Sequence, residues 1–421
     1  MTGGIHNLCA ALEVLSVERV SQDMNHREFD VAVIIRTAAF GGTERHTISL
    51  IRYLMESGVR VLLIESGEKI VSTALKGESE NLSFIHTELP MAETPKGVLR
   101  EWDEILSRFH STCAVLVKPW FYAASVPFLN LLRKHFARLV QIEHTTVAPR
   151  TKWHLGIHVN NGIHPGLWWY KEQFKTWRIA RASPEIITVS DFNKRCLVEN
   201  AFVDKRRIAV CKNGVDTKKW RYDRTSGVTF RRELNIPESD VVFSCVGRLA
   251  PEKGYELSID AFNQLASAGR RKNIHLCIVG EGPERNKLEE RAKANWEYIH
   301  FTGFRNDVNA VYSATDVLLA PSLHETYWSG ESFGYSLVES MACQCNVIAS
   351  ACGAIPEIIG DSGCDCLIYG RSVSAWADAM DKFARTRSDV RKLMGAKRRE
   401  WVVMNFEESA RMTDLVKAIL H

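Results

Sequence analysis

The chain of 421 residues is long enough for two or three domains of about 150 residues each. Hydrophobic residues make up 45% and charged residues 25%, a globular composition that excludes collagen-like and low-complexity classes. The formal net charge of +4 is too small to indicate nucleic-acid binding, so we expect no nucleic-acid partner.

Residues 1–28 are interpreted as an N-terminal extension whose role the sequence does not reveal. They make a poor signal peptide, because no basic residues lead them and Glu13 and Glu18 interrupt their apolar stretch. No apolar run approaches the roughly 20 residues of a membrane-spanning helix, since the best candidate, 114–132, contains Lys118 and two prolines. We therefore expect a cytoplasmic protein.

The eleven cysteines are scattered along the chain and form no CxxC pair. A structural zinc site would need two well-spaced pairs of ligands, which this sequence lacks. Buried free thiols in a reducing compartment are the better interpretation.

From residue 31 onward, short β-branched runs alternate with helix-length amphipathic segments. The runs lie at 31–36, 59–65, 113–118, 138–143, 185–189 and 207–212, and then at 241–246, 274–280, 316–322 and 346–350. Continuous apolar strands separated by helices predict parallel sheets that are covered on both faces. We expect an α/β fold with two Rossmann-like, doubly wound domains.

A polar and basic stretch interrupts this alternation once, and we place the inter-domain linker there, at 216–230. The N-terminal Rossmann-like domain is expected over 29–215 and the C-terminal one over 231–400. Residues 401–421 are predicted to form a helix that crosses back onto the first domain. Because ligands bind beyond the carboxyl ends of such strands, the site is expected in a cleft between the two domains.

One strand of the second half leads directly into Gly247 and Arg248, with Lys253 five residues further on. The glycine lets the backbone approach a ligand, and the two cations lie beside a helix N-terminus, which itself attracts anions. This pattern predicts a diphosphate site. A solvated loop whose cations pair with Glu252 or Asp260 explains the same residues equally well. The Walker type of phosphate loop does not occur.

The next strand is followed by Gly280, Gly282 and a helix. Arg285 stands where a dinucleotide fingerprint needs its third glycine, so the motif is a weak fingerprint. It is better interpreted as a tight turn at a ligand-facing strand end.

Glu331 and Glu339 belong to the segment ESFGYSLVE. Eight residues of helix rise about 12 Å, whereas two carboxylates that share one glycosidic bond lie about 5–9.5 Å apart. If the segment is helical, the two acids would serve two ends of an elongated ligand, one a sugar and the other a ribose. Two exposed acids on a surface helix remain the commoner explanation.

Two further features lie at strand ends of the first half. Gly41 and Gly42 precede Thr43, which is a candidate helix N-cap. His144 directly follows the run 138–143 and should face the cleft, although an isolated histidine is more often structural. The sequence contains no DxD motif and no carboxylate cluster suited to Mg²⁺ or Mn²⁺, so we expect no metal and no cofactor.

Taken together, these motifs resemble the retaining GT-B glycosyltransferases of the glycogen-synthase-like group 1 family. The resemblance covers roughly residues 30–420, is most specific in the C-terminal half, and matches the N-terminal half only at GGTE and His144. The motifs are GGTE (41–44), His144, NGVD (213–216), VGRLAPEKG (246–254), VGEGP (279–283), FTGF (301–304), ESFGYSLVE (331–339) and GAIPE (353–357).

The resemblance implies a nucleotide-sugar donor and transfer to an acceptor hydroxyl with retained configuration, without a metal. Arg248 and Lys253 would hold the donor diphosphate, Glu331 the donor sugar and Glu339 the ribose. His144 would lie near the reacting sugar. The remaining implied donor-binding residues are Gly42, Gly247, Gly280, Phe304, Arg305, Gly334, Tyr335 and Ser336, with Phe304 and Arg305 at the base.

The sequence departs from the family pattern before Glu331. The family usually runs quickly from its "PS" to this glutamate, but here Pro321 and Ser322 are followed by LHETYWSG. Either the loop is longer or Glu325 takes the sugar-binding role.

One predicted helix bears on the acceptor. Leu167, Tyr170, Phe174 and Trp177 recur at a spacing that predicts a core stripe. A second stripe, formed by Trp168, Lys171, Lys175 and Arg178, is basic and aromatic. Such a face suits an anionic membrane carrying a lipid-linked acceptor, while a solvated helix is the favoured alternative.

The expected activity is transfer of a hexose-type sugar to a glycan, a lipid-linked or a small-molecule acceptor. Two alternatives use the same donor site. One is another GT-B enzyme, a nucleotide-sugar epimerase or a sugar phosphorylase. The other is a sugar-nucleotide sensor that catalyses nothing.

Overall fold

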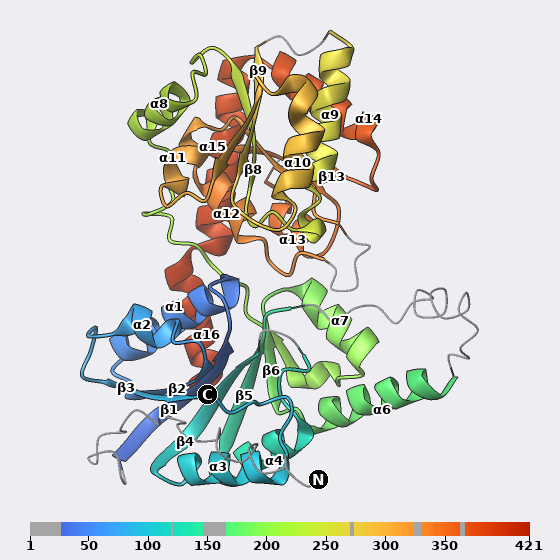
Figure 1. The fold of residues 1–421 in the computed structure, drawn as a ribbon. Helices are drawn as coiled ribbons and strands as arrows, with labels where there is room; N and C mark the ends of the chain where they lie inside the picture. The colour runs from blue at the N-terminus through green and yellow to red at the C-terminus, as the bar shows by residue number, and fades with distance from the viewer. Residues whose placement is uncertain (1–26, 119–120, 146–165, 270–272, 324–329, 363–366) are drawn as a thin grey trace, which may run out of the picture.

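The computed structural model describes residues 27–118, 121–145, 166–269, 273–323, 330–362 and 367–421. Two α/β domains, the lower mainly blue to green and the upper mainly yellow-green to red-orange in Figure 1, are stacked one on the other. Most of the expected N-terminal extension, and Glu325 with it, lie outside the described residues.

The N-terminal domain is built on a parallel sheet, which has seven strands among the described residues, in the order β3-β2-β1-β4-β5-β6-β7. Val31 of the central strand lies opposite Val61 on one side and Cys113 on the other. The strands are β1 (Arg27–Thr37), β2 (Val61–Gly67), β3 (Leu82–Thr87), β4 (Phe109–Lys118), β5 (Arg138–Glu143), β6 (Glu185–Thr188) and β7 (Ile208–Val210).

Helices cover both faces of this sheet, because each apolar strand turns alternate side chains to opposite faces. Val33 and Ile34, neighbours in β1, belong to different cores. One face carries α1 (Gly42–Glu56), α2 (Val71–Leu75) and α16 (Glu408–Leu420). The other carries α3 (Lys96–Leu106), α4 (Val126–His135), α6 (Gly166–Ala182) and α7 (Asp191–Ala201).

The C-terminal domain repeats this plan with a parallel sheet that has six strands among the described residues, in the order β10-β9-β8-β11-β12-β13. Val241 of β8 lies opposite Ile274 of β9. The strands are β8 (Val241–Val246), β9 (Ile274–Val279), β10 (Ile299–Gly303), β11 (Val317–Ala320), β12 (Asn346–Ser350) and β13 (Leu367–Ile368).

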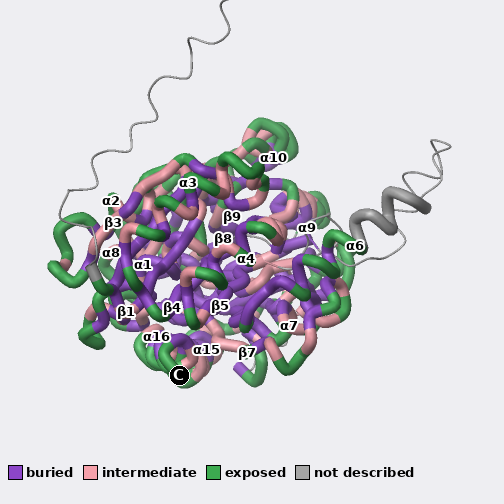
Figure 2. The backbone as a smooth tube through the Cα atoms, turned by 90° about the horizontal axis from the view of Figure 1, so that it is seen from below, coloured by how far each residue is buried: buried purple, intermediate pink, exposed green. Residues whose placement is uncertain are grey.

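Its helices also divide between two faces. One face packs α8 (Arg224–Glu233), α11 (Val308–Ala314), α12 (Tyr335–Ala342), α13 (Ile355–Ile359) and α15 (Ser388–Phe406). The other packs α9 (Tyr255–Ser267), α10 (Arg285–Ala292) and α14 (Val373–Arg385). Figure 2 shows the buried strands between the more exposed helices. The expected two doubly wound domains are thereby confirmed.

The chain passes between the domains twice, and the two passages touch. Val215 and Glu407 form a β-bridge. A Cβ atom at Gly214 would lie 2.6 Å from the Cα atom of Glu408, so only glycine allows this approach. The range 216–230 already contains the buried Trp220 and the start of α8, which pack in the C-terminal domain.

The range 401–421 is divided between two helices. Val402 and Phe406 at the end of α15 are buried in the core of the C-terminal domain. Met412 and Ile419 of α16 are buried against the N-terminal sheet, where α16 runs behind the lower domain in Figure 1. The crossing thus occurs between the two helices, at Glu407.

The expected core stripe on α6 is wrong at its described members. Phe174 is 58% exposed and Trp177 is 41% exposed. The helix buries Ile179 and Ala180 instead, and its other end extends away from the domain in Figure 1. The side chains of Leu167, Trp168, Tyr170 and Lys171 lie outside the described residues.

The described cysteines agree with the expectation from their scattered positions. All eight are free thiols, and seven of them are buried. They contribute to the cores as small apolar side chains.

Candidate active site

The strand order of each sheet indicates where a ligand would bind, and each domain has one such position. In each sheet the chain first builds outward on one side of its first strand and then crosses to the other side. The reversal lies between β1 and β4 in one domain and between β8 and β11 in the other. Ligands of doubly wound sheets bind at such reversals, beyond the carboxyl ends of the strands.

The glycines predicted to approach a ligand pack against each other. Gly247 follows β8 with a φ of 145°, and Gly280 follows β9 with a φ of 133°. A Cβ atom at Gly280 would lie 2.0 Å from the carbonyl oxygen of Gly247, so no other residue fits there. Gly254 touches the loop after β11 in the same way, since its Cβ atom would lie 2.3 Å from the Pro321 oxygen. The three loops therefore form one tightly packed surface.

Lys253 and Glu331 meet on this surface. The Nζ atom of Lys253 lies 2.8 Å from Oε2 of Glu331, and the Ser322 hydroxyl donates to the same oxygen at 3.3 Å. Burial alone would lower the pKa of Lys253, but Glu331 and nearby Glu252 raise it above its ordinary value. Burial alone would raise the pKa of Glu331, but Lys253 and Ser322 bring it below its ordinary value. Both groups are therefore charged at neutral pH.

Arg248 points elsewhere. Its side chain is 68% exposed and its guanidinium group pairs with Glu252, as the solvated-loop alternative anticipated. An exposed ion pair of this kind is worth little, so a bound anion can compete for the arginine.

The amino end of α12 lies beside the Lys253–Glu331 pair. Gly334 caps the helix with a φ of 79° and no side-chain hydrogen bond. A small cavity is lined by Lys253, Glu331, Gly334 and Ser336, among others. The free amide groups of the first helical turn favour a negative charge at this point.

The segment from Glu331 to Glu339 is helical only from Tyr335, so the expected rise of about 12 Å does not apply along its whole length. The two acids still have separate partners. The Glu339 carboxylate accepts hydrogen bonds from Arg45 and, at 3.2 Å, from the Tyr312 hydroxyl. Burial raises the pKa of Glu339, and Arg45 offsets this effect only in part.

His144 follows β5 and is buried against α1. Its ring packs edge-on against His46, with centroids 4.7 Å apart. Burial and the neighbouring His46 lower the pKa of His144 well below its usual value, so the ring is neutral at pH 7. Its Nε2 atom is buried without a hydrogen-bond partner.

The remaining predicted residues lie in three different environments. Gly42 faces the other domain, because its Cβ atom would lie 3.2 Å from the Tyr335 ring. Phe304, beyond β10, is 72% exposed. The guanidinium group of Arg305 is held by Asp307 and Glu233, so its side chain is committed within the protein.

The sequence reasoning missed several charged and polar residues at this edge. Lys118 and Glu143, the last residues of β4 and β5, are fully buried and pair at 3.0 Å. Gln141 donates to the same glutamate at 2.6 Å. A charged residue that ends a continuous apolar strand was a visible signal. The partners of Glu339, Arg45 and Tyr312, carried no comparable signal.

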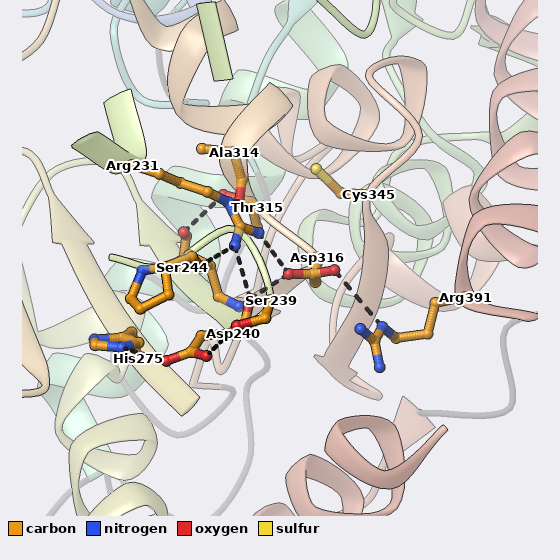
Figure 3. A network of polar contacts seen from close by, with 12 residues as sticks. Arg231, Ser239, Asp240, Ser244, His275, Ala314, Thr315, Asp316, Cys345 and Arg391 are labelled. Atoms are coloured by element: carbon orange, nitrogen blue, oxygen red, sulfur yellow. Dashed lines mark hydrogen bonds and ion pairs between the residues drawn. The ribbon is translucent and has the colours of Figure 1, made fainter. Parts of the chain in front are cut away.

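A pocket with a volume of about 570 Å³ lies away from this surface, at the amino-terminal edge of the C-terminal sheet. Figure 3 shows that its charged groups bind one another. Arg231 pairs with Asp316 at 2.7 Å and donates to the Asp240 carbonyl oxygen at 2.7 Å, while His275 lies 3.3 Å from the Asp240 carboxylate. Arg391 also reaches Asp316, at 3.6 Å. This network joins strand starts to helices, so we interpret it as structural.

Among the described residues, no three His, Cys, Asp or Glu side chains gather where they could hold a metal ion. None of the helices described there is long and apolar enough to span a membrane. The expected independence from metal stays a prediction.

Comparisons with solved structures identify the fold. Two facing, doubly wound domains define the GT-B fold, and a glycosyltransferase from Rickettsia africae matches it with a TM-score of 0.72 at 18% identity. That match covers 94% of this chain and 98% of the other. HepE from Anabaena, solved in complex with UDP, also has a TM-score of 0.72, at 15% identity over 92% and 99% of the chains.

Family models specify the class further. Residues 228–401 match "Glycosyl transferases group 1" and residues 40–219 match "Glycosyltransferase Family 4". One model falls on each domain, and together they support a group 1 glycosyltransferase, in agreement with the motifs.

Curated relatives match only part of the chain. A GDP-mannose-dependent phosphatidylinositol dimannoside mannosyltransferase of Mycobacterium tuberculosis is 40% identical over 36% of this chain and 37% of its own length. A 2-deoxystreptamine glucosyltransferase of Streptomyces kanamyceticus is 31% identical over 44% and 46%. The chain thus spans less than half the length of these relatives.

Proposed function

We propose that this protein is a retaining, metal-independent glycosyltransferase that moves a hexose-type sugar from a nucleotide diphosphate to an acceptor hydroxyl. One observation carries the proposal: Lys253, Glu331 and the amino end of α12 line the same small cavity at the reversal of the C-terminal sheet. A GDP-mannose-dependent relative and a structural neighbour that binds UDP support a nucleotide-sugar donor.

The donor diphosphate would bind between Lys253 and the amide groups of Gly334, Tyr335 and Ser336. Negative charge on the leaving phosphate grows as the bond to the sugar breaks, and fixed positive groups stabilise it most at that stage. Arg248 would leave Glu252 and join the diphosphate from the exposed side.

The two glutamates would serve opposite ends of the donor. Glu331, ionised and fixed by Lys253 and Ser322, would accept hydrogen bonds from the sugar hydroxyl groups. Glu339 would accept hydrogen bonds from the ribose. Glu325 stays the alternative ligand of the sugar.

Transfer would occur on one face of the sugar. The acceptor oxygen forms a bond to the anomeric carbon as the bond from that carbon to the phosphate oxygen breaks. Because both events take place on the same face, the configuration at the anomeric carbon is retained. The acceptor proton passes to the leaving phosphate, whose charge fixed cations rather than a metal would stabilise. His144, neutral and buried at the carboxyl end of β5 in the N-terminal domain, would contact the reacting sugar.

Among the expected acceptors, the exposed aromatic and basic side chains of α6 favour a lipid-linked one. Phe174 and Trp177 stack on each other in the solvent, with ring centroids 5.6 Å apart. The guanidinium groups of Arg178 and Arg181 lie over these rings. Aromatic rings beside cations suit the surface of an anionic membrane, so a cytoplasmic, peripherally bound enzyme is proposed.

Release of free nucleoside diphosphate tests the proposal. The protein is incubated with UDP-glucose or GDP-mannose, alone and with a panel of sugar and lipid-extract acceptors, in the presence of EDTA. Nucleoside diphosphate released only with an acceptor supports transfer. Appearance of the epimeric nucleotide-sugar without release indicates an epimerase, consumption of inorganic phosphate indicates a phosphorylase, and binding without release or epimerisation indicates a sensor.

A further inference from the structure

An ion pair joins the two domains beside the proposed ribose site. Arg45 lies in the first turn of α1, in the N-terminal domain, and its guanidinium group donates to Oε1 of Glu339, in α12 of the C-terminal domain. The same guanidinium group lies over the Tyr335 ring, 4.9 Å from its centroid, and 5.6 Å from that of Trp220. Arg45 is therefore fixed by the C-terminal domain although it belongs to the other one.

The two hydrogen-bond donors, Arg45 and Tyr312, leave acceptor positions of the Glu339 carboxylate free. Arg45 binds Oε1 of Glu339, and the Tyr312 hydroxyl binds Oε2. An ionised carboxylate has about four acceptor positions, so about two remain for further donors. A ribose offers two hydroxyl groups side by side, which matches this remaining capacity.

Glu339 depends on Arg45 for its charge as well as its orientation. The residue is 5% exposed, and burial raises the pKa of its carboxyl group. Among its neighbours, Arg45 is the strongest influence that lowers this pKa. A protonated carboxyl group would be a poorer acceptor for hydroxyl donors than a carboxylate.

We propose that Arg45 is a positioning residue for nucleotide recognition, which fixes the Glu339 carboxylate so that it accepts the ribose hydroxyl groups. The inference rests on the proposed function, because it takes Glu339 as the ribose ligand. It adds that nucleotide affinity, a property of the C-terminal domain, depends on a side chain of the N-terminal domain. Binding of the nucleotide is thereby coupled to approach of the two domains.

The same helix offers a matched control. Arg52, two turns further along α1, pairs with Glu78 inside the N-terminal domain and on its surface. Arg52→Gln removes a cation and an ion pair from α1 without touching Glu339. It separates a general loss of charge or stability from a loss of the specific contact.

Calorimetry with nucleotides that lack the ribose hydroxyl groups tests the inference. UDP and GDP are each compared with their 2′,3′-dideoxy forms, on the wild-type chain and on Arg45→Gln, Arg45→Lys, Glu339→Gln and Arg52→Gln. We expect the wild type and Arg52→Gln to prefer the ribose form by about tenfold or more. Arg45→Gln and Glu339→Gln should lose most of that preference, and Arg45→Lys should lose part of it.

The ratio of the affinities for the ribose and the dideoxy nucleotide is the decisive readout, because a merely structural role of Arg45 would weaken the binding of both equally. If Glu339→Gln loses the preference and Arg45→Gln keeps it, the inference is wrong and the proposed function stands. If the chain binds neither UDP nor GDP, ADP and its dideoxy form take their place in the series. If Glu339→Gln leaves the preference unchanged, the ribose site itself is wrong. Should Arg45→Gln fail to fold, Arg45→Lys carries the test, and an unchanged preference there overturns the inference.

Discussion

The ammonium group of Lys253 and the carboxylate of Glu331 lie 2.8 Å apart, although 78 residues separate them in the chain. They meet because the loop after β8 packs against the loop after β11, with Gly254 allowing the close approach. The pair neutralises itself without a ligand. A diphosphate would bind the remaining N–H groups of Lys253, while Glu331 keeps the ammonium group in place.

Lys253→Ala should reduce turnover more than it weakens binding of the intact donor. The reason is that the leaving phosphate gains charge toward the transition state, where a fixed cation acts most strongly. Loss of one such contact typically costs a factor of about 10²–10³ in rate. Steady-state kinetics measure the change, and Lys287→Ala, a surface lysine of the same domain paired with Glu284, is the control. An unchanged turnover number would leave Lys253 as a loop cation.

Glu339→Gln and Glu331→Gln should fail in different ways. Glu339→Gln should weaken the binding of nucleoside diphosphate and of intact donor alike, since both carry the ribose. Glu331→Gln should spare the binding of the nucleoside diphosphate and weaken only that of the sugar-bearing donor. A hydrogen bond to a charged group is worth about 1.5–3 kcal/mol, so each defect should reach about tenfold in calorimetry.

Glu325→Gln belongs in the same calorimetric series, because the departure from the family pattern makes it the rival sugar ligand. If this variant shows the sugar-selective loss and Glu331→Gln does not, the motif was assigned to the wrong carboxylate. If none of the variants separates donor from nucleotide, the two-ended arrangement is wrong.

Breaking the buried Lys118–Glu143 pair should destabilise the N-terminal domain strongly. Both side chains are fully buried, so Lys118→Met leaves a carboxylate without its cation. Such a loss typically costs about 3–5 kcal/mol, whereas replacing both partners by apolar residues often costs little. Urea unfolding should therefore show Lys118→Met as the weaker protein and Lys118→Met with Glu143→Leu as partly restored. Equal or additive losses in the double variant would contradict the pairing.

The free energy of unfolding should decrease as the pH is lowered through the range in which the buried His46 gains a proton. Burial lowers the pKa of His46 from 6.5 to about 4, so its contribution is present above 6.5 and is lost as pH falls toward 4. Between about pH 7.5 and about pH 5 the loss is of the order of 2 kcal/mol. In urea unfolding, the free energy of unfolding of His46→Gln should decrease less over this pH range than that of the wild type. His110→Gln, on the surface, should match the wild type. Parallel losses in all three proteins would show that His46 does not contribute.

The sheets and their reversals were predictable from the sequence, because continuous β-branched runs and glycine-rich turns are local signals. Lys253 and Glu331 could be named from motifs, but their contact could not, since loop packing brings it about. The pairing of Arg45 with Glu339 lay further out of reach. It depends on how two domains face each other, which no local pattern records.

The errors have physical causes as well. Phe174 and Trp177 recur at core spacing, but periodicity shows only which residues share a face of a helix. It does not show whether another element covers that face. The contact of Arg305 with the base, largely through its backbone, stays a prediction, although Asp307 and Glu233 occupy its guanidinium group. Local acidic partners compete with a ligand for the same cation.

Nucleotide binding in the absence of metal tests the central claim most directly. Thermal unfolding is measured with UDP, GDP, ADP and dTDP, each in EDTA and each with added Mg²⁺. One nucleoside diphosphate should stabilise the protein well above the others and equally in both conditions, by about 2.7 kcal/mol at 100 times its dissociation constant. Equal shifts for every nucleotide, or stabilisation only with Mg²⁺, would contradict a metal-independent nucleotide-sugar site at Lys253 and α12.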